Sequence, residues 1–142
     1  MSADVFLDTN ILLYASSSAP EDREKRLCAE NLILQTDFAL SAQVLQEYIA
    51  NALKKKSLGI SEANIDAILE LAYHCPVLPV SFELIVSATA IRRKYRLSPW
   101  DATIIAAAHE LGCKTLYSED LNHGQNYGGV RVVNPFLALT QA

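Results

Sequence analysis

The chain lacks the long apolar runs and the paired cysteines that mark several common classes of protein. No apolar run in its 142 residues approaches the roughly 18–20 residues that a membrane-spanning helix needs. Its three cysteines, Cys28, Cys75 and Cys113, stand far apart, so we expect reduced thiols and neither a disulfide framework nor a structural zinc site. The N-terminus also lacks the basic start and apolar stretch of a signal peptide. We therefore expect a cytoplasmic protein with no membrane partner.

The chain also lacks a basic excess, because its formal net charge is -4. Proteins that act on nucleic acids usually carry a basic face, so this balance argues against them at first sight. The acidity is compatible with such a role if several acids gather around a metal cation, which offsets their charge and offers positive charge to a phosphate. Hydrophobic residues make up 51% of the chain, which excludes disorder and predicts a single folded domain over residues 1–142.

Short apolar strands alternate with longer helical segments along the chain. The apolar runs predict strands over 5–7, 38–40, 77–80, 115–117 and 130–133, with a loop over 124–129. Helical spacing and serine caps predict helices that begin near residues 10, 21, 41, 61, 81 and 98. The proline at 79 suggests that the third strand lies at an edge. The alternation predicts an α/β fold, a Rossmann-like three-layer α/β/α sandwich with a mainly parallel central sheet.

Four acids fall near the expected carboxyl ends of the strands, where ligands bind in open α/β sheets. Asp8 ends the first strand, and Glu47 lies about two turns into the helix after the second. Asp101 opens a helix after Ser98, and Asp120 follows the fourth strand. Each acid alone has an ordinary explanation as a helix cap, a turn former or a surface residue. As a set, they predict a cluster that could converge in space.

Converging carboxylates repel one another, and a divalent cation relieves that cost. Ligands that are all oxygen suit Mg²⁺ or Mn²⁺ better than zinc. Such an ion can lower the pKa of bound water and clamp a phosphodiester during in-line attack. The acids therefore favour metal-dependent hydrolysis of a phosphodiester.

Several short segments together resemble the motifs of the PIN-domain nucleases. The opening Val-Phe-Leu-Asp-Thr-Asn-Ile-Leu at 5–12 is similar to the family's first motif, and Leu-Gln-Glu at 45–47 to its mid-chain glutamate. Ser-Pro-Trp-Asp-Ala at 98–102 and Leu-Tyr-Ser-Glu-Asp-Leu at 116–121 resemble the segments that carry the third and last acids. Asn-Pro-Phe at 134–136 resembles the ending of the VapC-type toxin branch. The resemblance covers about residues 3 to 136.

The resemblance implies an endoribonuclease that cleaves RNA with Mg²⁺ or Mn²⁺. Asp8, Glu47, Asp101 and Asp120 would be its catalytic and metal-binding residues. Glu119 lies beside Asp120 and leaves the identity of the fourth acid open, although Asp120 is favoured. Supporting roles, such as orienting a carboxylate or water, would fall to Thr9, Asn10 and Ser118. The VapC branch further implies the toxin of a toxin-antitoxin system, a homodimer, and a cognate antitoxin protein as partner.

Basic and aromatic residues outside the acid set are candidates for RNA contacts. The basic clusters are Lys54–Lys56 and Arg92, Arg93 and Lys94 with Arg96, which have an alternative explanation as solvated helix ends. Trp100, beside Asp101, is the first candidate for stacking on a base, ahead of Tyr127, whereas Tyr14 is expected in the core. His109 is interpreted as structural, and His123 as a possible substrate contact.

Two other functions compete with the nuclease. A haloacid-dehalogenase-like phosphatase also places an aspartate after its first strand, but it needs a second aspartate two residues later as general acid. Asn10 occupies that position and cannot donate a proton in this way. The other alternative is a non-catalytic interaction module on the same fold, which should show no stabilisation by divalent metal.

Overall fold

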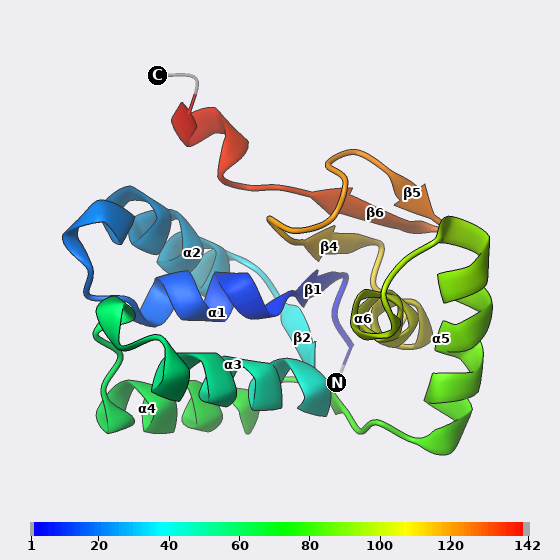
Figure 1. Cartoon of the computed structure of the whole chain (residues 1–142), viewed down its shortest axis with the longest axis horizontal. Helices are drawn as coiled ribbons and strands as arrows, with labels where there is room; N and C mark the ends of the chain where they lie inside the picture. Colours follow the sequence, from blue (N-terminus) through cyan, green and yellow to red (C-terminus); the bar gives the residue numbers. More distant parts are fainter. Residues whose placement is uncertain (1, 141–142) are drawn as a thin grey trace.

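A computed structural model describes residues 2–140 of the chain. Its sheet has six strands in the order β3-β2-β1-β4-β6-β5. All neighbouring strands are parallel except β5 and β6, which are antiparallel. Helices flank the sheet, with α1 to α4 gathered on one side of the strands and α5 and α6 on the other (Figure 1). The predicted α/β fold with a mainly parallel sheet is confirmed.

The elements follow the alternation expected from the sequence. The strands are β1 (Val5–Leu7), β2 (Phe38–Ser41), β3 (Val77–Leu78), β4 (Thr115–Tyr117), β5 (Asn126–Tyr127) and β6 (Val130–Val133). The helices are α1 (Thr9–Ser16), α2 (Arg23–Gln35), α3 (Ala42–Lys54), α4 (Glu62–Ala72), α5 (Phe82–Tyr95) and α6 (Pro99–Glu110). Three 3₁₀ turns complete the set: η1 (Pro20–Asp22), η2 (Lys56–Leu58) and η3 (Leu137–Thr140).

Serine side chains begin four of these helices. Ser41, Ser61, Ser81 and Ser98 each accept a hydrogen bond from a backbone N–H in the first turn of α3, α4, α5 and α6. Such a cap satisfies a donor that has no partner within the helix. These caps fix the points where the four helices begin, and Ser41 and Ser98 thereby set the starts of the two helices that carry Glu47 and Asp101.

The core lies on and around the central strands. Phe6 and Leu7 of β1 and Leu116 of β4 are fully buried. Helix α6 contacts β2, β4 and β6, and α5 packs along α6. Nearly every residue of α6 from Ala102 to Ala108 is buried, which explains its continuous apolar sequence. Within residues 2–140, no helix is both long and apolar enough to cross a membrane.

The structure corrects two details of the expected elements. The segment 124–129 is more than a loop, because Asn126 and Tyr127 form β5 and pair with β6. The two glycines at 128 and 129, both with positive φ, close this hairpin. The helix expected from residue 21 begins as α2 at Arg23, after the 3₁₀ turn η1.

Candidate active site

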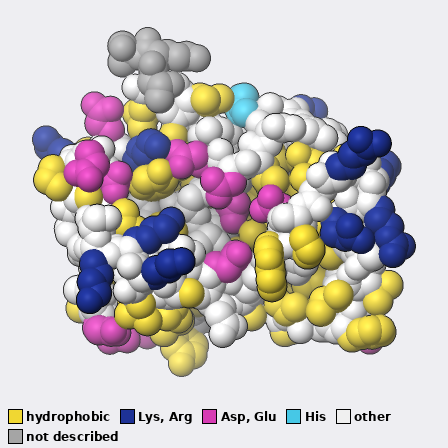
Figure 2. Space-filling view, viewed as in Figure 1, with side chains coloured by type: hydrophobic (Ala, Val, Ile, Leu, Met, Phe, Trp, Pro, Cys, Tyr) yellow, Lys and Arg dark blue, Asp and Glu magenta, His cyan; other side chains and the backbone are white. Residues whose placement is uncertain are grey.

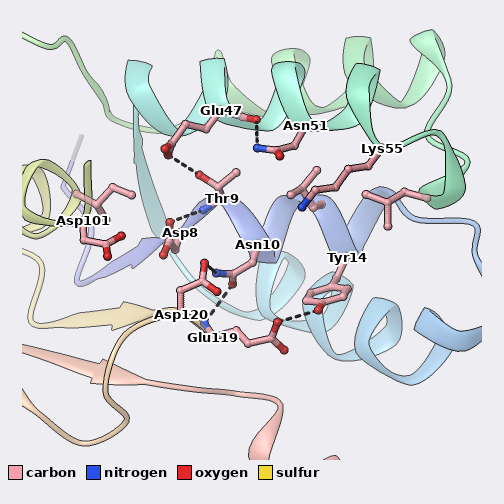
Figure 3. A pocket seen from close by; sticks show the side chains of 13 residues that line it. Asp8, Thr9, Asn10, Tyr14, Glu47, Asn51, Lys55, Asp101, Glu119 and Asp120 are labelled. Carbon is pink, nitrogen blue, oxygen red and sulfur yellow. Dashed lines mark hydrogen bonds between the residues drawn. The ribbon is translucent and has the colours of Figure 1, made fainter. Parts of the chain in front are cut away.

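A cavity of about 350 Å³ opens beyond the carboxyl ends of β1 and β4. Its lining comes from α1, α3, α6 and the segment after β4 (Figure 3). The four acids expected from the sequence all line it: Asp8, Glu47, Asp101 and Asp120. Segments that are far apart in the chain therefore bring these carboxylates to one pocket.

Asp8 lies at the base of the pocket and is only 3% exposed. It is the N-cap of α1, and its Oδ1 accepts a hydrogen bond of 2.7 Å from the backbone N–H of Thr9. Its Oδ2 accepts a hydrogen bond of 2.6 Å from the Ser118 hydroxyl. Burial raises the pKa of Asp8 to about 6, against the lowering effect of these two hydrogen bonds and with the help of repulsion from Asp120 and Glu47.

Glu47 reaches the pocket from α3. The Thr9 hydroxyl donates a hydrogen bond of 3.0 Å to Glu47 Oε1 and so joins the second residue of the opening motif to the mid-chain glutamate. One turn further along α3, the Asn51 side chain donates to the Glu47 carbonyl over 2.8 Å and also lines the pocket. This hydrogen bond to Glu47 is a contact through which Thr9 could orient a carboxylate, as expected from the sequence.

Asp101 faces the same pocket from the first turn of α6. The Ser98 hydroxyl accepts from the Asp101 backbone N–H over 3.1 Å. The buried amide of Gln43 donates to the Trp100 carbonyl over 3.1 Å, so α3 and the start of α6 are held together. Burial raises the pKa of Asp101, a hydrogen bond between its side chain and Ser98 lowers it, and repulsion from Asp120 raises it. Asp101 thus shares an electrostatic environment with an acid from the far side of the pocket.

Asp120 and Glu119 are neighbours with different partners. Asn10 donates its side-chain amide to Asp120 Oδ2 over 3.1 Å, and its Oδ1 accepts from the Glu119 backbone N–H over 3.3 Å. The Ser118 hydroxyl accepts from the Asp120 backbone N–H over 3.1 Å. Asn10 and Ser118 therefore hold the start of this loop beside Asp8.

The Glu119 carboxylate is bound by a cation and a phenol. Lys25 from α2 forms an ion pair of 2.6 Å with Glu119 Oε2, and the Tyr14 hydroxyl donates to Oε1 over 2.7 Å. The Lys25 ammonium also lies 4.7 Å from the centre of the Tyr14 ring. Burial and the hydrogen bond to Glu119 raise the pKa of Tyr14, which keeps the phenol protonated as a donor. Glu119 is thus held by positive charge, while Asp120 is held by a neutral amide.

The donor chemistry of the pocket fits a hard divalent cation, because its acidic groups are carboxylates and its other polar groups are mostly hydroxyl and amide. Burial of Asp8 among other carboxylates is the kind of unfavourable arrangement that a cation relieves. However, within residues 2–140 no group of three or more His, Cys, Asp or Glu side chains is placed so that it could hold a metal ion as it stands. The carboxylates surround the cavity and do not converge on one point.

Several of the expected RNA contacts lie away from this pocket. Trp100 is 67% exposed, but it lines a neighbouring hollow that shares Glu47 with the acidic pocket. Arg92, Arg93 and Lys94 are in the last turn of α5 and do not line the acidic pocket. Tyr127 is 3% exposed and packs edge-on against Tyr95, so the expectation that it stacks on a base is wrong.

The histidine and Tyr14 expectations have mixed outcomes. His109 is exposed on α6 and fills no core position, so its structural role is not supported. His123 accepts from the Asn134 backbone N–H over 3.0 Å and is exposed in the loop after Asp120. Tyr14 is half-buried and lines the pocket, a place at the site that its apolar sequence neighbours concealed.

Four lining residues were missed by the sequence reasoning as members of the site: Leu13, Asn51, Leu58 and Ile104. Asn51 follows Glu47 by four residues and shares one face of α3 with it, and Lys55, from the basic cluster expected to contact RNA, is the C-cap residue four positions later. Figure 2 shows acidic side chains in the middle of one face of the molecule, with basic side chains at both flanks and apolar ones beside the acids. The face around the site is therefore mixed in charge.

Solved structures with a similar fold include two bacterial complexes and one toxin. The chain aligns with a toxin-antitoxin complex from Klebsiella pneumoniae at a TM-score of 0.63 and 20% identity, covering 92% of this chain and 97% of that one. It aligns with the Sarcin-Ricin loop cleaving toxin VapC20 from Mycobacterium tuberculosis at a TM-score of 0.65 and 21% identity, covering 82% of this chain and 89% of that one. It aligns with DNA-bound VapBC from Salmonella typhimurium at a TM-score of 0.63 and 20% identity, covering 95% of this chain and 99% of that one. At such identities these likenesses show a shared fold.

The sequence itself provides the assignment to a family. No curated protein matches it significantly. The family model described as the PIN domain matches residues 5–128, which include all four acids of the pocket. The resemblance noted from the short motifs is confirmed over most of the chain. This chain belongs to the PIN domain family.

Proposed function

We propose that this chain is an endoribonuclease that hydrolyses RNA phosphodiester bonds with a bound Mg²⁺ or Mn²⁺ ion. The observation that carries the proposal is the meeting of Asp8, Glu47, Asp101 and Asp120 in one pocket at the carboxyl ends of parallel strands. Membership of the PIN domain family supports it. So does the likeness to a structural neighbour that is a Sarcin-Ricin loop cleaving toxin.

The metal would be held by these carboxylates and would supply a water of lowered pKa and charge for the phosphate. Mg²⁺ commonly uses only one or two carboxylates together with water and substrate phosphate, so a pocket with scattered carboxylates remains suitable. The chain's own residues would orient the ligands. Ser118 and the N-terminus of α1 fix Asp8, Thr9 fixes Glu47, and Asn10 fixes Asp120.

We further propose that the protein acts as the toxin of a toxin-antitoxin pair, with a cognate antitoxin protein as partner, and that it forms a homodimer. Neighbours described as a toxin-antitoxin complex and as VapBC support the antitoxin. Exposed apolar side chains near the starts of α5 and α6, among them Phe82, Ile85 and Trp100, support a protein contact of some kind. Light scattering on the purified chain tests the dimer, and co-purification with the product of a neighbouring gene tests the antitoxin.

The decisive experiment is RNA cleavage by the purified protein with Mg²⁺ or Mn²⁺, compared with EDTA and with Asp8→Asn. Asp66→Asn is the matched control, because Asp66 is an exposed acid on α4 outside the pocket. We expect cleavage that disappears with chelation and with Asp8→Asn and persists in Asp66→Asn. No cleavage of varied RNAs, together with no metal binding by calorimetry, would instead favour the non-catalytic interaction module. The phosphatase alternative gains no support, since Asn10 is engaged with the Glu119–Asp120 segment.

A further inference from the structure

The acidic pocket continues along α3 beyond its carboxylates. Glu47, Asn51 and Lys55 line it in turn, spaced by four residues. At about 1.5 Å per residue, the Cα atoms of Glu47 and Lys55 are on the order of 12 Å apart along the helix axis. One face of α3 and its C-cap residue Lys55 therefore present a carboxylate, an amide and an ammonium group from one end of the pocket to the other.

Lys55 is the one basic residue among the described residues that line this pocket. Figure 3 shows its side chain running back over α1, with the nitrogen directed into the pocket. Over the described part of the chain, Lys55 makes no side-chain hydrogen bond and no ion pair within 4.0 Å. An ammonium group in the same pocket as the carboxylates is thus left without a fixed partner and is available to an anion from outside.

The other basic side chains either form an ion pair or lie outside this pocket. Lys25 is paired with Glu119 at 2.6 Å. Arg92 lines a small separate hollow between α5 and α6, next to Thr103. Lys54 and Lys56, the immediate neighbours of Lys55, do not line the pocket. Lys55 is therefore singled out by its position in the pocket, which the other residues of the basic clusters do not share.

The backbone that carries Lys55 is held in place. Its own N–H donates to the Asn51 carbonyl over 2.8 Å. Just beyond it, the backbone N–H of Ser18 donates to the Leu58 carbonyl over 2.8 Å, and the Ser18 hydroxyl donates to the Gly59 carbonyl over 2.9 Å. Gly59 has a φ of 61°, and a side chain there would collide with the Ser18 hydroxyl. The η2 turn that follows Lys55 is thus fixed against the segment after α1, which keeps Lys55 at the pocket.

We propose that Lys55 binds the phosphate that flanks the scissile phosphate in the RNA substrate. The inference rests on the proposed ribonuclease function and adds a position for the strand, which would run along the groove between α1 and α3 from the carboxylates to Lys55. A cavity of about 350 Å³ is at the small end of ordinary ligand pockets, so it holds only a short stretch of the RNA strand. A lysine suits this role because it contacts a phosphate as a point charge without reading the base.

The first test is binding of a short fluorescent single-stranded RNA in EDTA, measured over a series of salt concentrations. The proteins are the wild type and Lys55→Gln, with Lys54→Gln and Lys56→Gln as controls that lose the same charge from adjacent positions. We expect only Lys55→Gln to reduce the slope of log K against log salt by about 0.7, the value for one phosphate contact on a single strand. Equal effects of all three substitutions, or none from Lys55→Gln, would overturn the proposal.

The second test uses cleavage with Mn²⁺ and a neutral methylphosphonate in place of one flanking phosphate at a time. For the wild type, one such replacement should raise KM and leave kcat unchanged, as expected for loss of binding that is uniform along the reaction. Lys55→Gln should show the raised KM with the unmodified RNA and no further loss with that replacement. A variant that remains as sensitive as the wild type to every neutral linkage would contradict the assignment.

The outcomes separate the two levels of the proposal. Wild-type protein that neither binds nor cleaves RNA overturns the ribonuclease function, whatever the variants do. Wild-type protein that cleaves RNA, with Lys55→Gln indistinguishable from Lys54→Gln, overturns only the role of Lys55. Lys55 is exposed, and thermal unfolding of each variant verifies that the fold is retained.

Discussion

The Ser118 hydroxyl donates a 2.6 Å hydrogen bond to Oδ2 of Asp8 and accepts one of 3.1 Å from the backbone N–H of Asp120. A single buried side chain therefore joins the acid at the end of β1 to the loop that carries the last acid. Neither contact depends on substrate, so the arrangement is already formed in the free protein. Ser118 is the residue on which the relative placement of Asp8 and Asp120 depends most directly.

Replacing Ser118 with alanine should reduce RNA cleavage by roughly 10- to 100-fold, the range typical of residues that orient metal ligands. The Ser118 hydrogen bond lowers the pKa of Asp8, so its loss should raise that pKa further. We expect the acid limb of the rate profile to move to higher pH, as measured by initial rates across pH. The control is Ser16→Ala, because Ser16 is a buried serine bonded to Tyr48 outside the pocket. Wild-type rates with an unmoved acid limb would contradict the role.

The carboxylate of Asp8 should destabilise the metal-free protein at neutral pH. Its pKa rises from 3.8 to about 6 on folding, so the folded state holds its proton more tightly than the unfolded state. Stability is therefore lost as pH increases from about 4 through about 6, by up to ~3 kcal/mol. In EDTA, Asp8→Asn should be more stable than the wild type at pH 7, and the difference should shrink near pH 4. Urea unfolding at both pH values measures this, and a difference independent of pH would refute it.

The identity of the fourth acid can be tested through metal-linked stability. Mn²⁺ at a hundred times its Kd should stabilise the wild type by about 2.7 kcal/mol, seen as an increase in Tm. Asp120→Asn should lose most of this increase, whereas Glu119→Gln should retain most of it, because Lys25 and Tyr14 hold Glu119. The reverse pattern would assign the role to Glu119.

The ion pair between Lys25 and Glu119 should contribute more to stability than an ordinary surface pair. Its partners are 32% and 27% exposed, and Tyr14 supports it. A double-mutant cycle with Lys25→Met and Glu119→Gln should give a coupling energy of about 0.5–1 kcal/mol. The comparison pair is Arg26–Glu30 on α2, 3.8 Å apart and more exposed, for which we expect about 0.3 kcal/mol or less. Equal coupling in the two cycles would show that the pair is not special.

Much of the fold could be predicted because local signals agreed with tertiary structure. The apolar run before Asp8 and the serines at 41, 81 and 98 fixed strand ends and helix starts with little competition. Strand β5 was not predicted, because a strand of two residues between polar neighbours shows almost no alternation of apolar and polar residues. The pair Gly128–Gly129 before Val130 was its available signal, since two glycines favour a tight hairpin.

The site was predictable to the extent that it depends on strand ends. Asp8 and Asp120 follow neighbouring parallel strands, so their proximity follows from topology. The commitment of Glu119 to Lys25 could not be predicted, because the two residues are 94 positions apart and their contact depends on how α2 packs. The cluster Lys54–Lys56 was a candidate for RNA contacts, but the choice of Lys55 within it requires knowing how the end of α3 lies against α1. The spacing of eight residues from Glu47 was the signal that distinguishes Lys55 from Lys54 and Lys56.

The wide spacing of the four acids has a consequence for how the protein is made. Synthesis proceeds from the N-terminus, and the pocket needs residues as late as Asp120, whose β4 strand pairs on one side with β1 and on the other with β6. A nascent chain that has exposed only Asp8, Glu47 and Asp101 lacks both Asp120 and the hydroxyl of Ser118 that holds Asp8. The complete carboxylate set therefore forms only late in translation, so incomplete chains on the ribosome lack an assembled pocket.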